Sequence, residues 1–237
     1  MKNIFPIFLL VLCSYLASGQ DCEAILYEEG FTMDVPPTGW TGDFSTTPAP
    51  LIEGWYTTSG PTTTMATGPE VPAAGTHFAY MESSGPAPSN STFRIQTPIV
   101  SIPTDGTTAL SLSFLMFGSD IGSFEIQVLD GNSIDPIFMR SGEQHSDGTL
   151  GSWEAISLDL SAYAGSDIQI QFQGMKLISG LGDIGIDEIV FCHTPPVIEP
   201  IPTLGTWSLI CLGMLLMIFG LVTLQNRSEL PTIKVRS

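Results

Sequence analysis

Hydrophobic and polar residues alternate in short segments along the middle of the chain. In residues 109–117, Leu110, Leu112 and Phe114 fall on one side of an extended strand, with serines between them. Because side chains in a strand point alternately to its two faces, this pattern predicts a strand with one buried face. Further strand signals occur in residues 77–81, 91–95, 97–102, 123–129, 153–158 and 167–173.

Turn residues separate these segments. Asp130-Gly131 is a pair that favours a tight turn, and residues 159–166 are typical of a corner. Residues 57–75 are rich in Thr, Pro, Gly and Ala and predict a long connection. Roughly ten short strands without an amphipathic helix indicate an all-β fold, an antiparallel β-sandwich with Greek-key connections.

The last strand-like segment, residues 182–192, is also acidic. Its isoleucines favour a sheet, whereas Asp183, Asp187 and Glu188 repel one another unless solvent or a cation lies between them. In a regular strand Asp187 and Glu188 point to opposite faces. That spacing does not match the paired carboxylates of a sandwich-fold glycosidase, so a remnant glycoside hydrolase is only the third functional alternative.

Both ends of the chain carry apolar segments outside the sandwich. Residues 1–19 combine Lys2, an apolar run and small residues, which is the pattern of a signal peptide. Residues 207–224 contain no charged residue and predict about 27 Å of helix, enough to span a bilayer. The tail, residues 225–237, is basic, whereas the region before the apolar run is acidic, so the positive-inside rule predicts a cytoplasmic C-terminus.

The sandwich is then predicted to occupy residues 20–194, followed by a Pro-rich spacer at residues 195–206. The chain has 237 residues and a net charge of −17. Without the signal peptide and the tail, three basic residues face 23 acidic ones, a net charge of −20. So acidic a surface repels nucleic acid and anionic lipid, and we expect no nucleic acid partner.

Only two of the four cysteines belong to the exported region. Cys13 leaves with the signal peptide, and Cys211 lies in the apolar run. In an oxidising compartment we expect Cys22 and Cys192 to pair; two free thiols are the alternative. Their spacing does not form a zinc site.

Four parts of the sequence together resemble the MAM domain of extracellular adhesion proteins and receptors: residues 118–128, Trp153, residues 170–174, and the run from Gly180 to Cys192. The resemblance implies a jelly-roll sandwich that acts in cell-surface recognition, usually without catalysis. This chain lacks the two middle cysteines of the family's usual four. A disulfide between Cys22 and Cys192, in the first and last strands, is the substitute that we favour.

Related jelly rolls also suggest a metal site. In them, a glutamate after the first aromatic residue and an aspartate of the closing strand meet across neighbouring strands. The matching positions here are Glu28, Glu29 and Asp187. Carboxylate oxygens on a rigid sheet suit calcium, so the resemblance implies one structural Ca²⁺. Exposed carboxylates on a solvated acidic face are the alternative.

A second resemblance begins where the spacer ends. Ile201, Pro202, Thr203, Leu204 and Trp207, with the apolar run that follows, are similar to bacterial C-terminal sorting signals. Such signals imply a sorting protease as a partner. The helix is then temporary, and the mature protein passes to the cell surface.

From these observations we expect an exported adhesion or interaction module, anchored or sorted through its C-terminal segment. Its partners are surface proteins or glycans. A carbohydrate-binding module is the first alternative, and Trp40 and Trp55, which lie near turns, are the predicted exposed platform for sugar rings. Trp153, which opens an alternating segment, is expected to belong to the core instead.

Overall fold

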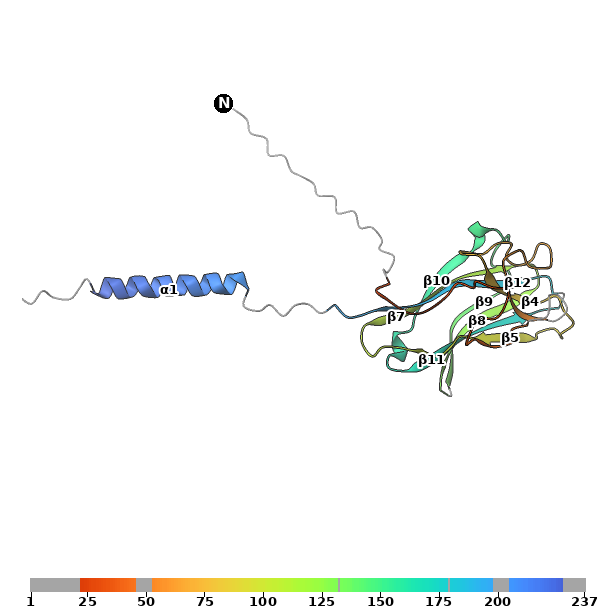
Figure 1. Cartoon of the computed structure of the whole chain (residues 1–237), viewed down its shortest axis with the longest axis horizontal. Coiled ribbons are helices and arrows are strands. Elements are labelled where there is room, and N and C mark those ends of the chain that lie inside the picture. The colour runs from red at the N-terminus through yellow and green to blue at the C-terminus, as the bar shows by residue number, and fades with distance from the viewer. Residues whose placement is uncertain (1–21, 46–52, 132, 179, 198–204, 228–237) are drawn as a thin grey trace, which may run out of the picture. The chain divides into compact units, whose positions relative to one another are not determined.

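The computed structural model describes residues 22–45, 53–131, 133–178, 180–197 and 205–227. The chain separates into two compact units, residues 1–196 and residues 197–237. In the first unit the described strands form two facing sheets (Figure 1). The predicted signal peptide and the sorting residues Ile201 to Leu204 lie outside the described residues.

The first sheet is antiparallel and has the strand order β10-β7-β12-β4-β3, with β1 also paired to β12. Its strands are β1 (Ala24–Glu29), β3 (Gly54–Thr58), β4 (Phe78–Glu82), β7 (Thr107–Phe117), β10 (Glu154–Asp159) and β12 (Asp183–Thr194). The longest of these, β12, therefore lies in the middle of the sheet.

The second sheet is also antiparallel and has the order β2-β5-β11-β8-β9, with β6 paired to β11. Its strands are β2 (Thr41–Gly42), β5 (Thr92–Gln96), β6 (Val100–Ser101), β8 (Ile121–Asp130), β9 (Ser133–Ser141) and β11 (Asp167–Lys176). The predicted antiparallel β-sandwich is thus confirmed.

Aromatic side chains from both sheets meet between them. The Phe114 ring lies 5.9 Å from that of Phe124, which lies 6.4 Å from that of Phe172. All three are fully buried, and burying one such side chain contributes roughly 1.5–3 kcal/mol. They occupy the positions that the alternation assigned to the inner face, which is why the alternation predicted these strands.

A buried ion pair also joins the two sheets. Lys176, at the end of β11, contacts the carboxylate of Glu53, the residue before β3. The Lys176 Nζ atom also donates to the carbonyl oxygen of Gly85 at 3.1 Å. Removing one partner from such a pair would leave an uncompensated buried charge.

The central strand β12 changes its neighbour halfway along its length. One edge pairs with β7 throughout, whereas the other pairs with β4 over residues 184–186 and with β1 over residues 189–193. The change coincides with a bulge between Asp187 and Val190, where Glu188 adopts a left-handed backbone φ of 52°. The bulge adds a residue to β12 without breaking the sheet.

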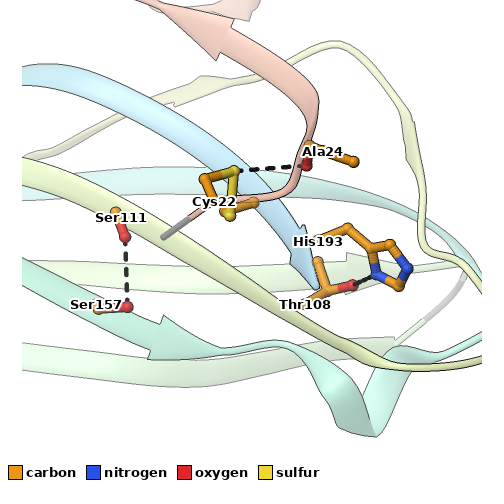
Figure 2. The surroundings of a disulfide bond; sticks show 7 residues. Cys22, Ala24, Thr108, Ser111, Ser157 and His193 are labelled. Atoms are coloured by element: carbon orange, nitrogen blue, oxygen red, sulfur yellow. Dashed lines mark hydrogen bonds between the residues drawn. A yellow bond between two sulfur atoms is a disulfide. The ribbon is translucent and has the colours of Figure 1, made fainter. Parts of the chain in front are cut away.

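The predicted disulfide between Cys22 and Cys192 is present. It links Cys22, just before β1, to Cys192, near the end of β12 (Figure 2), and the Cα atoms of the two cysteines are 5.4 Å apart. Because β1 pairs with β12 over residues 24–29 and 189–193, the covalent bond reinforces a contact that the sheet already makes.

The alternation predicts neither β3 nor β9. Residues 54–57 of β3 are all buried, because the strand is covered on both faces, so buried and exposed positions do not alternate along it. β9 lies at the edge of its sheet, is largely exposed and contains Pro136. Proline is tolerated at a sheet edge, but its presence argues against a strand when only the sequence is read.

The second unit contains the helix α1 (Thr206–Arg227), which includes the predicted apolar segment. Residues 208–225 have a mean hydropathy of 2.2, and none of their side chains is buried in the protein. A helix that is apolar on all sides and this long fits a bilayer. The predicted cytoplasmic orientation of its C-terminal end remains a prediction.

The disulfide predicts a large effect on stability. Cys22→Ser should lower the free energy of unfolding by about 5 kcal/mol in the chain-entropy model, because the bond closes a loop across 170 residues. Urea unfolding of the full chain in non-ionic detergent, followed by tryptophan fluorescence, measures this change. Cys211→Ser removes the free cysteine of α1 and should leave the midpoint unchanged; equal midpoints for both variants would contradict the prediction.

Candidate functional site

The outer face of the first sheet has two different halves. Over the first half, the loop of residues 59–77 covers β3, β4 and the start of β12. Pro69 of this loop lies so close to Gly185 that an added Cβ would be 2.3 Å from its Cγ atom. Trp153 covers the same area, with its ring 5.8 Å from that of Phe78 and its Nε1 donating to the carbonyl oxygen of Val71 at 3.0 Å.

The buried carboxylate of Asp183 holds one end of the loop of residues 59–77 by hydrogen bonds. It accepts hydrogen bonds from the Ser83 backbone N–H at 3.2 Å and from the Thr67 hydroxyl at 3.1 Å. Burial, and then the nearby charge of Glu82, raise the pKa of Asp183 to about 7. The loop thus contributes a donor that partly offsets the cost of burying this group.

Asp187 holds the other end of this loop. One carboxylate oxygen accepts from the backbone N–H groups of Ala73 and Ala74 at 3.0 and 3.2 Å, and the other accepts from the N–H of Glu188 at 2.8 Å. Burial raises the pKa of Asp187 to about 6, against the opposing effect of these hydrogen bonds. The part of the outer face that the loop covers therefore ends at Asp187, next to the bulge.

The prediction that Asp187 and Glu188 point to opposite faces is wrong. Glu188 accepts a hydrogen bond from the Ser113 hydroxyl at 2.9 Å, and Ser113 lies on the outer side of β7 because its neighbours Leu112 and Phe114 are in the core. Both carboxylates line one hollow on the outer face. The bulge, with its left-handed backbone at Glu188, turns the side chain to this face.

The second half of the outer face is uncovered and forms a groove. Three adjoining hollows of about 620, 410 and 460 Å³ follow β12 from the disulfide to Glu29. We call them the outer groove; its main lining residues are Ala109, Ser111, Ser113, Ala155, Ser157, Asp159, Glu188, Val190 and Cys192. Apart from Glu188 and Cys192, sequence reasoning did not select these residues, although the small side chains at outward positions of β7 and β10 were a visible signal.

The residues predicted to hold calcium come together at the acidic end of this groove. Glu28, Glu29 and Asp187 line the same hollow. Glu29 accepts from the backbone N–H of Phe31 at 2.7 Å, and burial raises its pKa. Among the described residues, however, no three histidine, cysteine, aspartate or glutamate side chains are arranged to hold a metal ion.

The predicted tryptophan platform is wrong, because both rings are buried. Trp55 is fully buried, and its Nε1 donates to the carbonyl oxygen of Phe93 at 3.1 Å. Trp40 stacks on Phe172 at 5.9 Å and donates to the Tyr27 hydroxyl at 2.6 Å. Trp153, expected in the core, packs half-buried on the outer face instead.

These features define a disulfide-linked β-sandwich module followed by an apolar helix. The family model "MAM domain, meprin/A5/mu" matches residues 41–195. The chain belongs to this family, which confirms the first resemblance. The "IPTL-CTERM motif" matches residues 199–226 and confirms the second.

Solved structures with similar folds come from several bacterial proteins. The K3 cleaved adhesin domain of Lys-gingipain from Porphyromonas gingivalis W83 is 17% identical, with a TM-score of 0.48; the match covers 71% of this chain and 97% of that one. A cyclase from Fischerella sp. TAU is 11% identical, with a TM-score of 0.49 and coverages of 69% and 88%. The CBM22-1 xylan-binding domain of Paenibacillus barcinonensis Xyn10C is 14% identical, with a TM-score of 0.45 and coverages of 73% and 97%. These values are too low to transfer an activity or a ligand to this chain.

The two buried aspartates predict a dependence of stability on pH. A raised pKa means that the folded protein holds the Asp183 proton more tightly than the unfolded chain does. The resulting stabilisation is complete below the unfolded pKa of about 3.9 and is lost as the pH rises through about 7. Asp183→Asn should therefore reduce the loss of stability between roughly pH 4 and pH 7, measured by urea unfolding of the full chain in detergent.

Asp187→Asn provides the contrast. Its amide NH₂ would face the backbone N–H groups of Ala73 and Ala74 or that of Glu188, so this variant should lose roughly 1–3 kcal/mol at pH 5 as well. In Asp183→Asn the amide NH₂ can donate to the Thr67 hydroxyl oxygen, because the single proton of that hydroxyl can turn to the Thr64 carbonyl oxygen at 2.8 Å. If the stability of Asp183→Asn depended on pH as strongly as that of the unchanged chain, Asp183 would not be the source of the pH dependence.

Proposed function

We propose that this chain is a non-catalytic adhesion module of the cell surface, exported and then held or sorted through its C-terminal segment. The observation that carries the proposal is the presence of a MAM domain and an IPTL-CTERM motif in one chain. The first suggests recognition outside the cell, and the second, with its apolar helix, suggests attachment to or sorting at a membrane.

The structure of the domain supports a location outside the cell. Its two described cysteines outside α1 are joined in a disulfide, and such bonds persist in oxidising compartments. The buried carboxylates of Asp183 and Asp187 accept hydrogen bonds that hold the loop of residues 59–77. Holding the fold is a sufficient role for both groups, which favours a binding module over a remnant hydrolase.

Carbohydrate binding is less well supported than adhesion. The tryptophans expected to stack on sugar rings, Trp40 and Trp55, are both buried. The outer groove, which is the uncovered part of the first sheet, has a floor of serine, alanine and valine, and no aromatic side chain lines it among the residues that the structure describes. Aromatic platforms favour sugar binding, whereas a floor of small residues favours contact with a polypeptide backbone.

The proposal predicts that adhesion requires the whole chain. Cells that make the full chain should aggregate or attach more than cells that lack it. A variant that ends after residue 206, and so lacks α1, should not restore attachment, because the domain would be released. Auto-aggregation and surface-attachment assays measure this; the intact mass of the surface protein reports whether α1 and the tail are retained or removed by a sorting protease. Unchanged attachment with the protein present on the surface would contradict the proposal.

We also propose a structural Ca²⁺ at Glu28, Glu29 and Asp187. The shared hollow and the hard carboxylate oxygens support it. Because no ready set of three such side chains exists in the described part of the chain, backbone carbonyls and water would have to supply most of the six to eight oxygens that calcium takes. Calcium would then relieve the repulsion among these acids.

Calcium is therefore expected to raise the melting temperature, and EDTA to lower it. At a calcium concentration 100 times Kd, binding stabilises the folded state by about 2.7 kcal/mol. For a domain of this size, this raises the melting temperature by roughly 5–10 °C. Glu29→Gln should abolish the rise, and Glu23→Gln, at an exposed position, should keep it. A melting temperature that ignores calcium and EDTA would show that the site does not exist.

A further inference from the structure

The three hollows of the outer groove form one continuous surface. The first and second share Ser111, Ser157 and Val190, and the second and third share Glu188 and Val190. The groove crosses β10, β7 and β12 beside the disulfide, where Ser111 and Ser157 lie on neighbouring strands with their hydroxyls 3.3 Å apart (Figure 2). A ligand could therefore contact the sheet along several consecutive residues.

The floor of the groove consists of small side chains. Ala109, Ser111 and Ser113 occupy successive outward positions of β7, and Ser157 and Val190 flank them on β10 and β12. Large side chains fill the other half of this face, where Trp153 and the 59–77 loop cover the strands. A smooth floor of this kind lets an extended polypeptide backbone approach the sheet closely.

Exposed acidic residues lie in the first hollow of the groove and where its second and third hollows meet. Asp159 and Glu188 are both exposed and line the groove. Hydrogen bonds from the hydroxyl and the backbone N–H of Ser161 lower the pKa of Asp159, which keeps it charged. No lysine, arginine or histidine lines any of the three hollows in the described part of the chain. Charge complementarity therefore favours a cationic ligand.

The two acids have a defined spacing along the sheet. Asp159 pairs with Ala109 of β7, and Glu188 accepts from Ser113 of the same strand. Along the strand direction, the four residues from Ala109 to Ser113 span roughly 13 Å. Across that direction, Asp159 lies on β10 and Glu188 on β12, on the two sides of β7. An extended ligand has the same rise, so its residues i and i+4 lie on one face at this separation.

We propose that the outer groove binds an extended cationic segment of a partner surface protein, through two basic side chains four residues apart that reach Asp159 and Glu188. This inference rests on the proposed function and names the chemistry of the partner. One face of an antiparallel sheet can also simply face water, and the experiment is designed to separate these two situations.

The probe is a fluorescent peptide of sequence Gly-Lys-Ser-Val-Ser-Lys-Gly, in which the lysines are four residues apart. Gly-Lys-Ser-Val-Lys-Ser-Gly has the same composition, but its lysines point to opposite faces. A third peptide carries glutamate in place of both lysines. Fluorescence anisotropy with the full chain in non-ionic detergent, at low salt, measures the affinity of each peptide. The first should bind most tightly and the acidic one should not bind.

Variants of the groove identify where the peptide binds. Glu188→Gln and Asp159→Asn should each weaken binding of the first peptide about two- to fivefold, as expected for exposed ion pairs, and Ser157→Trp should weaken it further by filling the groove. Asp135→Asn makes the same change of charge at an exposed position of β9, in the other sheet, and should have no effect. Near-ultraviolet circular dichroism shows whether each variant folds; the two charge variants remain informative if Ser157→Trp does not.

Several results would overturn the proposal. One is equal affinity for both lysine peptides, and another is equal weakening by Asp135→Asn, because both indicate attraction to the acidic surface in general. The absence of binding would also overturn it, as would a neutral oligosaccharide that occupies the groove regardless of these charges. If attachment of cells requires the chain but ignores Glu188→Gln and Asp159→Asn, the adhesion proposal stands and the groove proposal fails. If the peptide binds as expected but cells attach equally without the chain, the groove proposal stands and the adhesion proposal fails.

Discussion

The structure of the first sheet depends on supplying hydrogen-bond donors to two carboxylates buried on its central strand. Asp183 and Asp187 are fully buried, and a buried carboxylate without partners would cost several kcal/mol. Apart from the backbone N–H of Glu188, their donors come from the loop of residues 59–77 and from Ser83, just after β4. The loop is therefore a third layer over half of the sandwich, held by hydrogen bonds to the two carboxyl groups beneath it.

The bulge at Glu188 marks the border of this layer. Before it, β12 pairs with β4 and lies under the loop; after it, β12 pairs with β1 and its outer face is open. One additional residue thus separates a part of the sheet that stabilises the fold from a part that is free to bind. The change of neighbour also brings Glu29, at the end of β1, to the same hollow as Asp187.

The sequence predicted those features that have a local cause. Period-two alternation identified β7, β8 and β11 because each has one face in the core, and the disulfide followed because only two cysteines belong to the exported region. Burial of Trp40 and Trp55 was not predictable from nearby turns, since their partners Phe172 and Phe93 are distant in the sequence. The bulge was equally hidden, because its residues resemble a regular strand; the orientation of Glu188, and hence the groove, depends on it.

The disulfide also bears on how the domain carries mechanical load. A force transmitted along the chain toward the second unit enters the sandwich at Thr194, the last residue of the central strand. Only His193 and Thr194 can peel from the sheet before the force reaches Cys192, which is bonded to Cys22. Beyond that point the load is shared between the two chain segments on either side of the bond. A surface protein pulled through its C-terminal connection would therefore lose at most the end of one strand, with Thr194 at the edge of the first hollow, while the rest of the groove stays in place.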